Sequence, residues 1–279
     1  MPTTDDIAHL QAFLTKWELS GAAERANAQA FLLELCEVLD VPKPDPATPD
    51  QAANAYVFEK VVPSAEGTSN FIDLYKRGCF VLETKQGADA IPSGNDVRAD
   101  HDPPHAPSHE APVSAEGEQR RRARKKGHGL RGSRGWDTAM ERARNQAERY
   151  ARSLPLAEIP GGRPPFLLVV DVGHSIALYA DWSRAGGHYA PFPDPASYRI
   201  GLKDLARAEV RERLRLVWTD PLALDPNRRS AKVTREVAQR LGKLAKSLER
   251  DSGSGPGMTA ESGMTPESVA NFLMRCLFT

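Results

Sequence analysis

The spacing of hydrophobic residues divides the first part of the chain into helical and extended stretches. Apolar side chains recur every three or four positions over residues 4–40, which predicts two helices. Apolar runs rich in β-branched and aromatic residues at 56–62 and 71–85 predict strands, and the second run is long enough to fold back as a hairpin. Helical spacing returns at 136–154 and ends before Pro155.

The second half of the chain continues the alternation of strands and helices. Residues 165–172 are nearly all apolar, which predicts a central strand buried on both faces, and residues 175–181 predict its neighbour. Helical spacing resumes at 202–212 and again at 233–248. The order predicts an α/β fold, in which a mixed sheet flanked by helices is followed by a helical spacer.

The amino-acid composition limits the kind of protein that this chain can be. The 279 residues carry 37 basic and 37 acidic side chains, and 40% of the residues are hydrophobic, which is enough for a buried core. Three cysteines lie far apart, so a disulfide framework is not expected. With no signal peptide and no long apolar segment, we expect a soluble, cytoplasmic protein without membrane contact.

The balanced charge conceals two opposite segments within a predicted surface insertion at 87–134. An acidic stretch rich in proline precedes a run of basic residues that contains no acid. The basic run can contact nucleic-acid phosphates, or it can be a solvated loop balanced by the acidic stretch. The residues expected to contact phosphates are Arg120, Arg121, Arg122, Arg124, Lys125, Lys126 and Arg131.

The hairpin at 71–85 carries the set of side chains that phosphodiester hydrolysis requires. Asp73 lies on its first strand, and Glu83 and Lys85 lie two positions apart on its second strand. Two carboxylates can hold Mg²⁺, which activates water and polarises the phosphoryl oxygen, and an ammonium can stabilise developing negative charge. The alternative is an edge hairpin whose charged side chains are merely solvated.

The length of the turn decides whether these groups share one face of the sheet. A three-residue loop, Lys76-Arg77-Gly78, pairs residues 75 and 79 and places Asp73 on the face of Glu83 and Lys85. A two-residue turn places Asp73 on the opposite face. We predict the longer loop, because glycine suits the left-handed position such loops use. On the later helix, Gln146 and Tyr150 lie one turn apart and can both reach over the sheet edge.

These residues resemble the PD-(D/E)xK nuclease superfamily, in particular its RecB-like branch. Asp73, Glu83 and Lys85 match the catalytic pattern, and Gln146 with Tyr150 match the later Gln-x-x-x-Tyr helix. The chain is most similar to the N-terminal part of MmeI-like type IIL restriction–modification enzymes. The phrases that carry the resemblance are YVFEKVVP (56–63), FIDLYKRGCFVLETKQGAD (71–89), GWDTAMERARNQAERYARSLP (135–155) and ANFLMRCLF (270–278).

The resemblance implies roles for individual residues. Asp73 and Glu83 would bind the metal, the Thr84 carbonyl would add a ligand, and Lys85 would position the nucleophilic water. Gln146 and Tyr150 would orient Lys85 or contact the DNA backbone. Glu34 and Glu59 are optional further ligands or ordinary surface acids.

The resemblance also implies a division of the chain and its partners. Residues 1–195 would form the endonuclease domain, and residues 196–279 a helical spacer that ends before an adenine-specific DNA methyltransferase and a target-recognition domain. No Asn-Pro-Pro-Tyr motif is present, so S-adenosylmethionine is expected only for that further part. Double-stranded DNA is the expected substrate, with possible transient self-association because two strands must be cut. The alternative function is a non-catalytic DNA-binding or scaffold module of a methyltransferase polypeptide.

Overall fold

The computed structural model describes residues 4–18, 24–63, 69–85, 87 and 130–252. The elements that precede the central strands follow the predicted order. They are α1 (Thr4–Glu18), α2 (Glu24–Leu39), β1 (Tyr56–Pro63), β2 (Ser69–Lys76), β3 (Phe80–Lys85), α4 (Arg134–Ser153) and the 3₁₀ turn η1 (Leu156–Glu158). The remainder comprises β4 (Phe166–Asp171), β5 (Ser175–Ala180), β6 (Ala190–Pro191), β7 (Arg199–Gly201), η2 (Leu202–Ala206), α5 (Ala208–Thr219), η3 (Pro221–Leu224) and α6 (Pro226–Ser252).

The described strands form one mixed sheet, which confirms the predicted α/β class. Its order is β1-β2-β3-β4-β5-β6, and β7 also pairs with β5. The pairs are antiparallel except for β3 and β4, which run parallel. Every residue of β4 is buried, as expected of a central strand covered on both faces.

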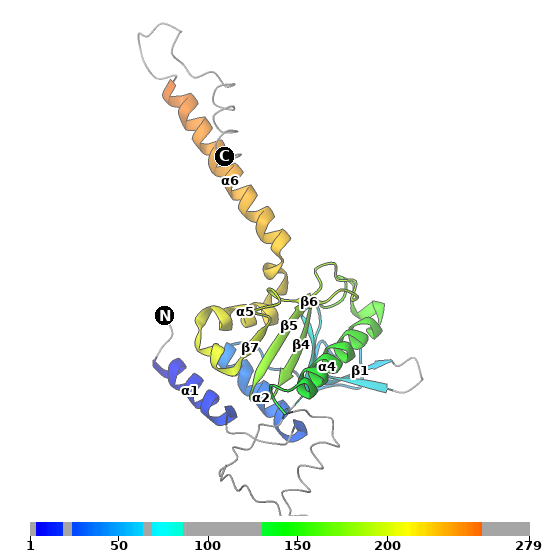
Figure 1. Cartoon of the computed structure of the whole chain (residues 1–279). Coiled ribbons are helices and arrows are strands. Elements are labelled where there is room, and N and C mark those ends of the chain that lie inside the picture. The colour runs from blue at the N-terminus through cyan, green and yellow to red at the C-terminus, as the bar shows by residue number, and fades with distance from the viewer. Residues whose placement is uncertain (1–3, 19–23, 64–68, 86, 88–129, 253–279) are drawn as a thin grey trace, which may run out of the picture. The chain divides into compact units, whose positions relative to one another are not determined.

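Helices cover both faces of this sheet (Figure 1). On one face, Met140, Ala143 and Ala147 of α4 pack with Val81 of β3 and Leu167 of β4 in a single apolar cluster. These α4 residues are spaced by three or four, so they form one helical stripe.

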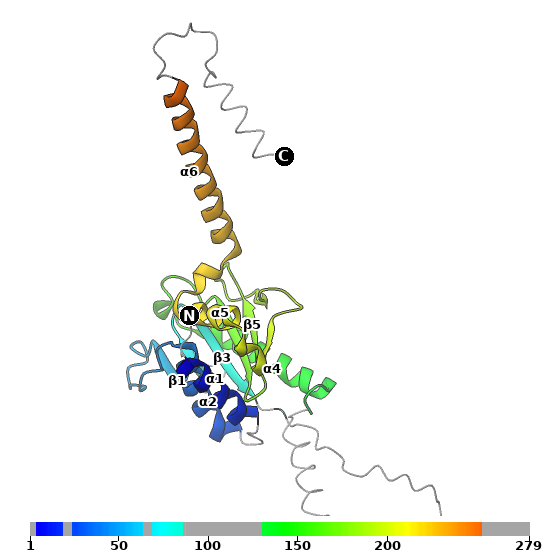
Figure 2. The ribbon, with the colours of Figure 1, turned by 90° about the vertical axis from the view of Figure 1, so that its left-hand side faces the viewer.

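The opposite face is covered by α2 and α5 (Figure 2). The rings of Phe80 in β3 and Trp218 in α5 lie 4.5 Å apart between centroids. Tyr56 joins the two helices to β1, because its hydroxyl accepts a hydrogen bond from Trp218 Nε1 at 3.0 Å and lies 3.5 Å from Cys36 Sγ of α2. The strand that carries Glu83 and Lys85 is therefore packed from both sides.

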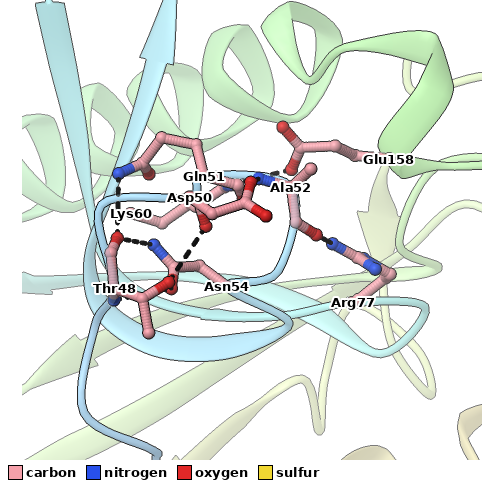
Figure 3. Close-up of polar contacts among 8 residues, drawn as sticks. All are labelled: Thr48, Asp50, Gln51, Ala52, Asn54, Lys60, Arg77 and Glu158. Carbon is pink, nitrogen blue, oxygen red and sulfur yellow. Dashed lines mark hydrogen bonds and ion pairs between the residues drawn. The ribbon is translucent and has the colours of Figure 1, made fainter.

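A buried lysine ties the segment before β1 to the segment after α4 (Figure 3). The Lys60 side chain is fully buried, and its Nζ lies 2.8 Å from Glu158 Oε2 in η1. The same Nζ donates to the Gln51 carbonyl and lies 5.9 Å from the centre of the Tyr75 ring. A buried charge requires such compensation. The ion pair links β1 to η1, and the hydrogen bond to the Gln51 carbonyl holds the loop at residues 48–54 against the sheet.

Two details differ from the sequence prediction. The short strands β6 and β7 were not expected, and the helix predicted at 202–212 is two elements, η2 and α5, separated at Arg207. Leu202 and Leu205 are three positions apart, a spacing that fits a 3₁₀ turn as well as an α-helix. The Asp204 side chain accepts a hydrogen bond from Gly201 N at 2.8 Å and holds that tight turn.

The structure divides into two compact units. The first ends at Pro221 and so includes β7, η2 and α5, whereas the sequence placed a domain boundary after residue 195. The second begins at Leu222 and contains α6. Among the helices that the structure describes, none is long and apolar enough to cross a membrane. The residues beyond 252 lie outside the described part of the chain, as does most of the predicted insertion at 87–134.

Candidate active site

A cleft of about 360 Å³ lies at the end of β3 and is lined by α2, β1, β2, β3 and α4. It brings together side chains from these five elements, which span residues 28 to 150 of the sequence. The predicted site residues that line it are Glu59, Asp73, Glu83, Thr84, Lys85, Gln146 and Tyr150. Glu34 is not among its lining residues. The Glu34 carboxylate instead accepts a hydrogen bond from Trp17 Nε1 at 2.9 Å and pairs with Lys16, which joins α1 to α2.

The hairpin register brings the two carboxylates to the same cleft. The expected three-residue turn is present, but it comprises Arg77–Cys79, so that Lys76 pairs with Phe80 and Tyr75 with Val81. The prediction that residue 75 pairs with residue 79 was therefore wrong by two positions, which leaves the parity of the strands unchanged. Gly78 has φ 71° in this turn, the left-handed conformation that glycine adopts without strain.

Asp73 occupies a position where the regular pairing of the strands is interrupted. The β1–β2 ladder pairs Phe58 with Leu74 and Lys60 with Ile72 but omits Glu59 and Asp73, and the β2–β3 ladder ends before Asp73. Its carboxylate oxygen Oδ2 accepts hydrogen bonds from Thr84 N and Thr84 Oγ1, both at 2.6 Å. The side chain thus replaces the missing main-chain bond and is held against the end of β3.

Glu83 is held from the helix side of the cleft. Its side chain is only 1% exposed, and Oε2 accepts a hydrogen bond from Gln146 Nε2 at 2.8 Å. The same amide donates to the Tyr150 hydroxyl at 3.1 Å. Burial, followed by the nearby Glu83 carboxylate, raises the pKa of Tyr150, so this phenol stays neutral at physiological pH. The sequence analysis expected Gln146 and Tyr150 to orient Lys85 or to contact the DNA backbone; in the structure Gln146 binds Glu83, which lies beside Lys85.

Lys85 lies in the same cleft as Asp73 and Glu83. Its Nζ donates to the Thr84 carbonyl at 2.8 Å and lies 3.8 Å from Glu83 Oε2, and its side chain is 23% exposed. The ammonium therefore lies beside one carboxylate and one main-chain oxygen while remaining accessible from the cleft. This placement allows it to stabilise negative charge that develops there.

The donor set of the cleft fits a hard divalent cation. Asp73, Glu83 and the Thr84 carbonyl offer oxygen atoms, which Mg²⁺ prefers, and Mg²⁺ commonly binds through one or two carboxylates while keeping several waters. In the part of the chain that the structure describes, no group of three or more His, Cys, Asp and Glu side chains is arranged to hold one ion. Any ion here would therefore rely on two carboxylates, the carbonyl and water.

A second buried carboxylate, which the sequence analysis missed, organises the surroundings of Lys85. Asp171 at the end of β4 is fully buried and is the register partner of Lys85. It accepts hydrogen bonds from Gly87 N at 2.9 Å, from Trp136 Nε1 at 2.8 Å, and from Arg131 Nε and Nη2 at 3.0 and 2.9 Å. The signal in the sequence was an acid ending a wholly apolar strand, because a buried carboxylate needs partners.

This arrangement gives Arg131 a role other than the expected phosphate contact. Its side chain is only 10% exposed, and its guanidinium binds Asp171 through two nitrogen atoms and the Val172 carbonyl at 3.0 Å. Such two-pronged pairing with a buried acid is structural. The other residues of the basic run, Arg120, Arg121, Arg122, Arg124, Lys125 and Lys126, lie outside the described residues.

Comparison with known protein families shows the family of the chain. The sequence model described as "MmeI, N-terminal domain" matches residues 5–251. The chain belongs to the MmeI N-terminal domain family. No curated protein and no solved structure matches the chain. Membership in the MmeI N-terminal domain family indicates that the chain is part of a DNA-interacting, multidomain restriction–modification enzyme.

Proposed function

We propose that this chain is the Mg²⁺-dependent endonuclease part of a single-chain restriction–modification enzyme, with the active site of the PD-(D/E)xK superfamily. The observation that carries the proposal is the meeting of Asp73, Glu83, Thr84 and Lys85 in one cleft at the end of β3. Charged side chains scattered on a solvated edge hairpin would not be expected to converge in this way.

The proposed mechanism follows from what each residue can do. Asp73 and Glu83 would hold the cation together with the Thr84 carbonyl. When bound, the ion supplies Lewis-acid polarisation of the phosphoryl oxygen and lowers the pKa of water. Lys85 would hold the attacking water at its Nζ and would stabilise the negative charge that develops as the water transfers its proton to bulk solvent. Gln146 fixes the Glu83 carboxylate, and Tyr150, as a neutral phenol, fixes the Gln146 amide.

The remaining partners are part of the same proposal. An adenine-specific methyltransferase domain, which uses S-adenosylmethionine, and a target-recognition domain would lie in the same polypeptide and select the DNA. Two copies of the nuclease would associate transiently on double-stranded DNA, since one active site cuts one strand.

The decisive test is Lys85→Ala in the restriction–modification polypeptide. We expect cleavage of a plasmid to fall by roughly 100-fold or more, because an electrostatic stabiliser of the transition state is lost, while adenine methylation is retained. Lys203→Ala is the matched control, since Lys203 is 84% exposed and pairs with Glu18 outside the cleft. Cleavage that survives Lys85→Ala would refute the proposal and favour a non-catalytic DNA-binding module.

A second measurement examines the metal site without relying on activity. Mn²⁺ binding to the chain, followed by calorimetry, should weaken by roughly tenfold or more in Asp73→Asn and Glu83→Gln, because each replaces an anionic oxygen ligand with an amide. Glu34→Gln should leave Mn²⁺ binding unchanged, since Glu34 pairs with Lys16 and Trp17. Equal binding by all four proteins would remove the metal site from the proposal.

A further inference from the structure

The helix α6 has a strongly uneven distribution of charge that the cleft does not explain. It is one uninterrupted helix of 27 residues (Figure 1), about 40 Å long at 1.5 Å per residue. Asp225 caps its start, because Asp225 Oδ1 accepts a hydrogen bond from Asn227 N at 2.9 Å and Pro226 occupies the first helical position. Because the helix is continuous, the direction of each side chain about its axis follows from the position of the residue in the sequence.

Basic residues of α6 gather on one side. At 100° per residue, five of them fall within about 80° of arc and form a straight row about 27 Å long. This row, called here the basic stripe, consists of Arg228, Lys232, Arg235, Lys243 and Lys246, and all five are exposed. Arg229 and Arg240 flank it. Among the α6 side chains that the structure describes, Glu236 is the one acid, so the stripe is not neutralised within its own helix.

Few carboxylates among the described residues lie close enough to pair with the basic stripe. Arg228 lies 3.9 Å from Asp225 Oδ2 at the helix start. Within the described residues, the other four members of the stripe have no carboxylate within ion-pair distance. This contrasts with most exposed cations of the first unit, such as Lys43 with Glu37, which are paired.

An apolar row lies on the opposite side of α6. Val233, Val237 and Leu244 share a face, and they are 59%, 39% and 55% exposed. This row is centred roughly 140° from the basic stripe. Because apolar side chains favour burial, whatever surface covers them leaves the basic stripe directed away from that surface. The two rows together give the helix one side for packing and one side for anions.

We propose that the basic stripe of α6 binds the phosphate backbone of double-stranded DNA. DNA presents phosphates at 3.4 Å intervals of rise along each strand, so a 27 Å row of cations matches roughly eight base pairs. Lysine and arginine contacts to phosphates carry no sequence information, so the stripe supplies affinity and orientation rather than site selection. The proposal uses the DNA context of the family, and it does not depend on the chain being a nuclease.

The test is a salt titration of DNA binding by the 279-residue chain. The stripe variant carries Lys232→Gln, Arg235→Gln, Lys243→Gln and Lys246→Gln, since glutamine preserves helix propensity. Binding of a fluorescent 30-base-pair duplex is measured by anisotropy at several NaCl concentrations without divalent cations. The slope of log affinity against log salt should fall by about 3 to 4, and affinity near 0.1 M salt should fall by at least about tenfold.

A control variant removes the same charge elsewhere. It carries Lys43→Gln, Lys203→Gln, Arg207→Gln and Arg215→Gln, which replace three exposed cations and one half-buried cation, Arg215, that are already paired with carboxylates. Its slope should match that of the unaltered chain. An unchanged slope in the stripe variant, an equal loss in the control, or no measurable binding by the unaltered chain at low salt would each overturn the proposal. The first of these results is the one expected if the stripe faces an acidic protein surface instead.

Discussion

A single backbone irregularity explains how Asp73 reaches its partners. Opposite Asp73, Glu59 adopts φ 50°, a left-handed conformation that non-glycine residues avoid. The β1–β2 ladder skips this pair, which frees the Asp73 side chain to bind Thr84. Strain of this kind persists where the surrounding structure enforces it and is concentrated at functional sites.

The strain at Glu59 can be measured by substitution. Glu59→Gly should raise the free energy of unfolding by about 1 kcal/mol relative to Glu59→Ala, because both remove the carboxylate but only glycine relieves the left-handed conformation. Urea unfolding of the two variants measures the difference. Equal stability of Glu59→Gly and Glu59→Ala would show that the backbone at this position is not strained.

At the scale of elements, Asp171 joins three segments that surround the candidate site. It binds Gly87 after β3, Arg131 before α4, and Trp136 in the first turn of α4. The approach at Gly87 is close, since an added Cβ would lie 2.8 Å from Arg131 Cγ and 3.0 Å from Asp171 Oδ2. The two strands that end at Lys85 and Asp171 and the helix that carries Gln146 are thereby held in one arrangement.

The contacts of Asp171 predict that removing its charge will strongly lower the free energy of unfolding. Asp171→Asn should lower the free energy of unfolding by about 3 kcal/mol, because the buried Arg131 loses its compensating carboxylate. Asp137→Asn is the control, since Asp137 is 60% exposed and its ion pair with Arg199 should contribute less than about 1 kcal/mol. Urea unfolding measures both, and similar values for the two variants would contradict a stabilising role for the Asp171 junction.

At the scale of the whole first unit, tyrosines are buried on both faces of the sheet. Tyr56 lies on the α5 side, and Tyr75, Tyr179 and Tyr189 lie in the cluster beneath α4. Burial raises the pKa of Tyr75 and of Tyr179 to about 12 and raises those of Tyr56 and Tyr189 still further. The folded protein therefore keeps these protons at pH values where the unfolded chain releases them.

These shifts predict loss of stability at alkaline pH. Below about pH 10 the tyrosines are neutral in both states and stability is unaffected by them. As pH rises through 10 toward 12, only the unfolded chain ionises, so the free energy of unfolding should fall by up to about 1.4 kcal/mol per pH unit for each buried tyrosine. Urea unfolding at pH 9, 10 and 11, with absorbance at 295 nm, measures this. Ionisation of these tyrosines near pH 10 in a still folded chain would contradict it.

Much of the fold could be predicted because its elements have strong local patterns. The stripe on α4, the apolar run of β4 and the hairpin glycine at position 78 each determine structure within a few residues. The short strand β7 could not be predicted, since its three residues pair with β5 only after the chain has folded back. The candidate site was predicted on the same basis, from the spacing of Asp73, Glu83 and Lys85.

The sequence by itself determined the order of helices and strands, the shared face of the two carboxylates and the family resemblance, because these depend on periodicity, parity and motif spacing. Tertiary structure alone decided which partners the charged groups take. In the folded chain, Arg131 binds Asp171, Glu34 binds Trp17 of α1, and Gln146 binds Glu83. Those pairings join residues between 17 and 63 positions apart, and only the packing of the sheet and helices sets the distances between them.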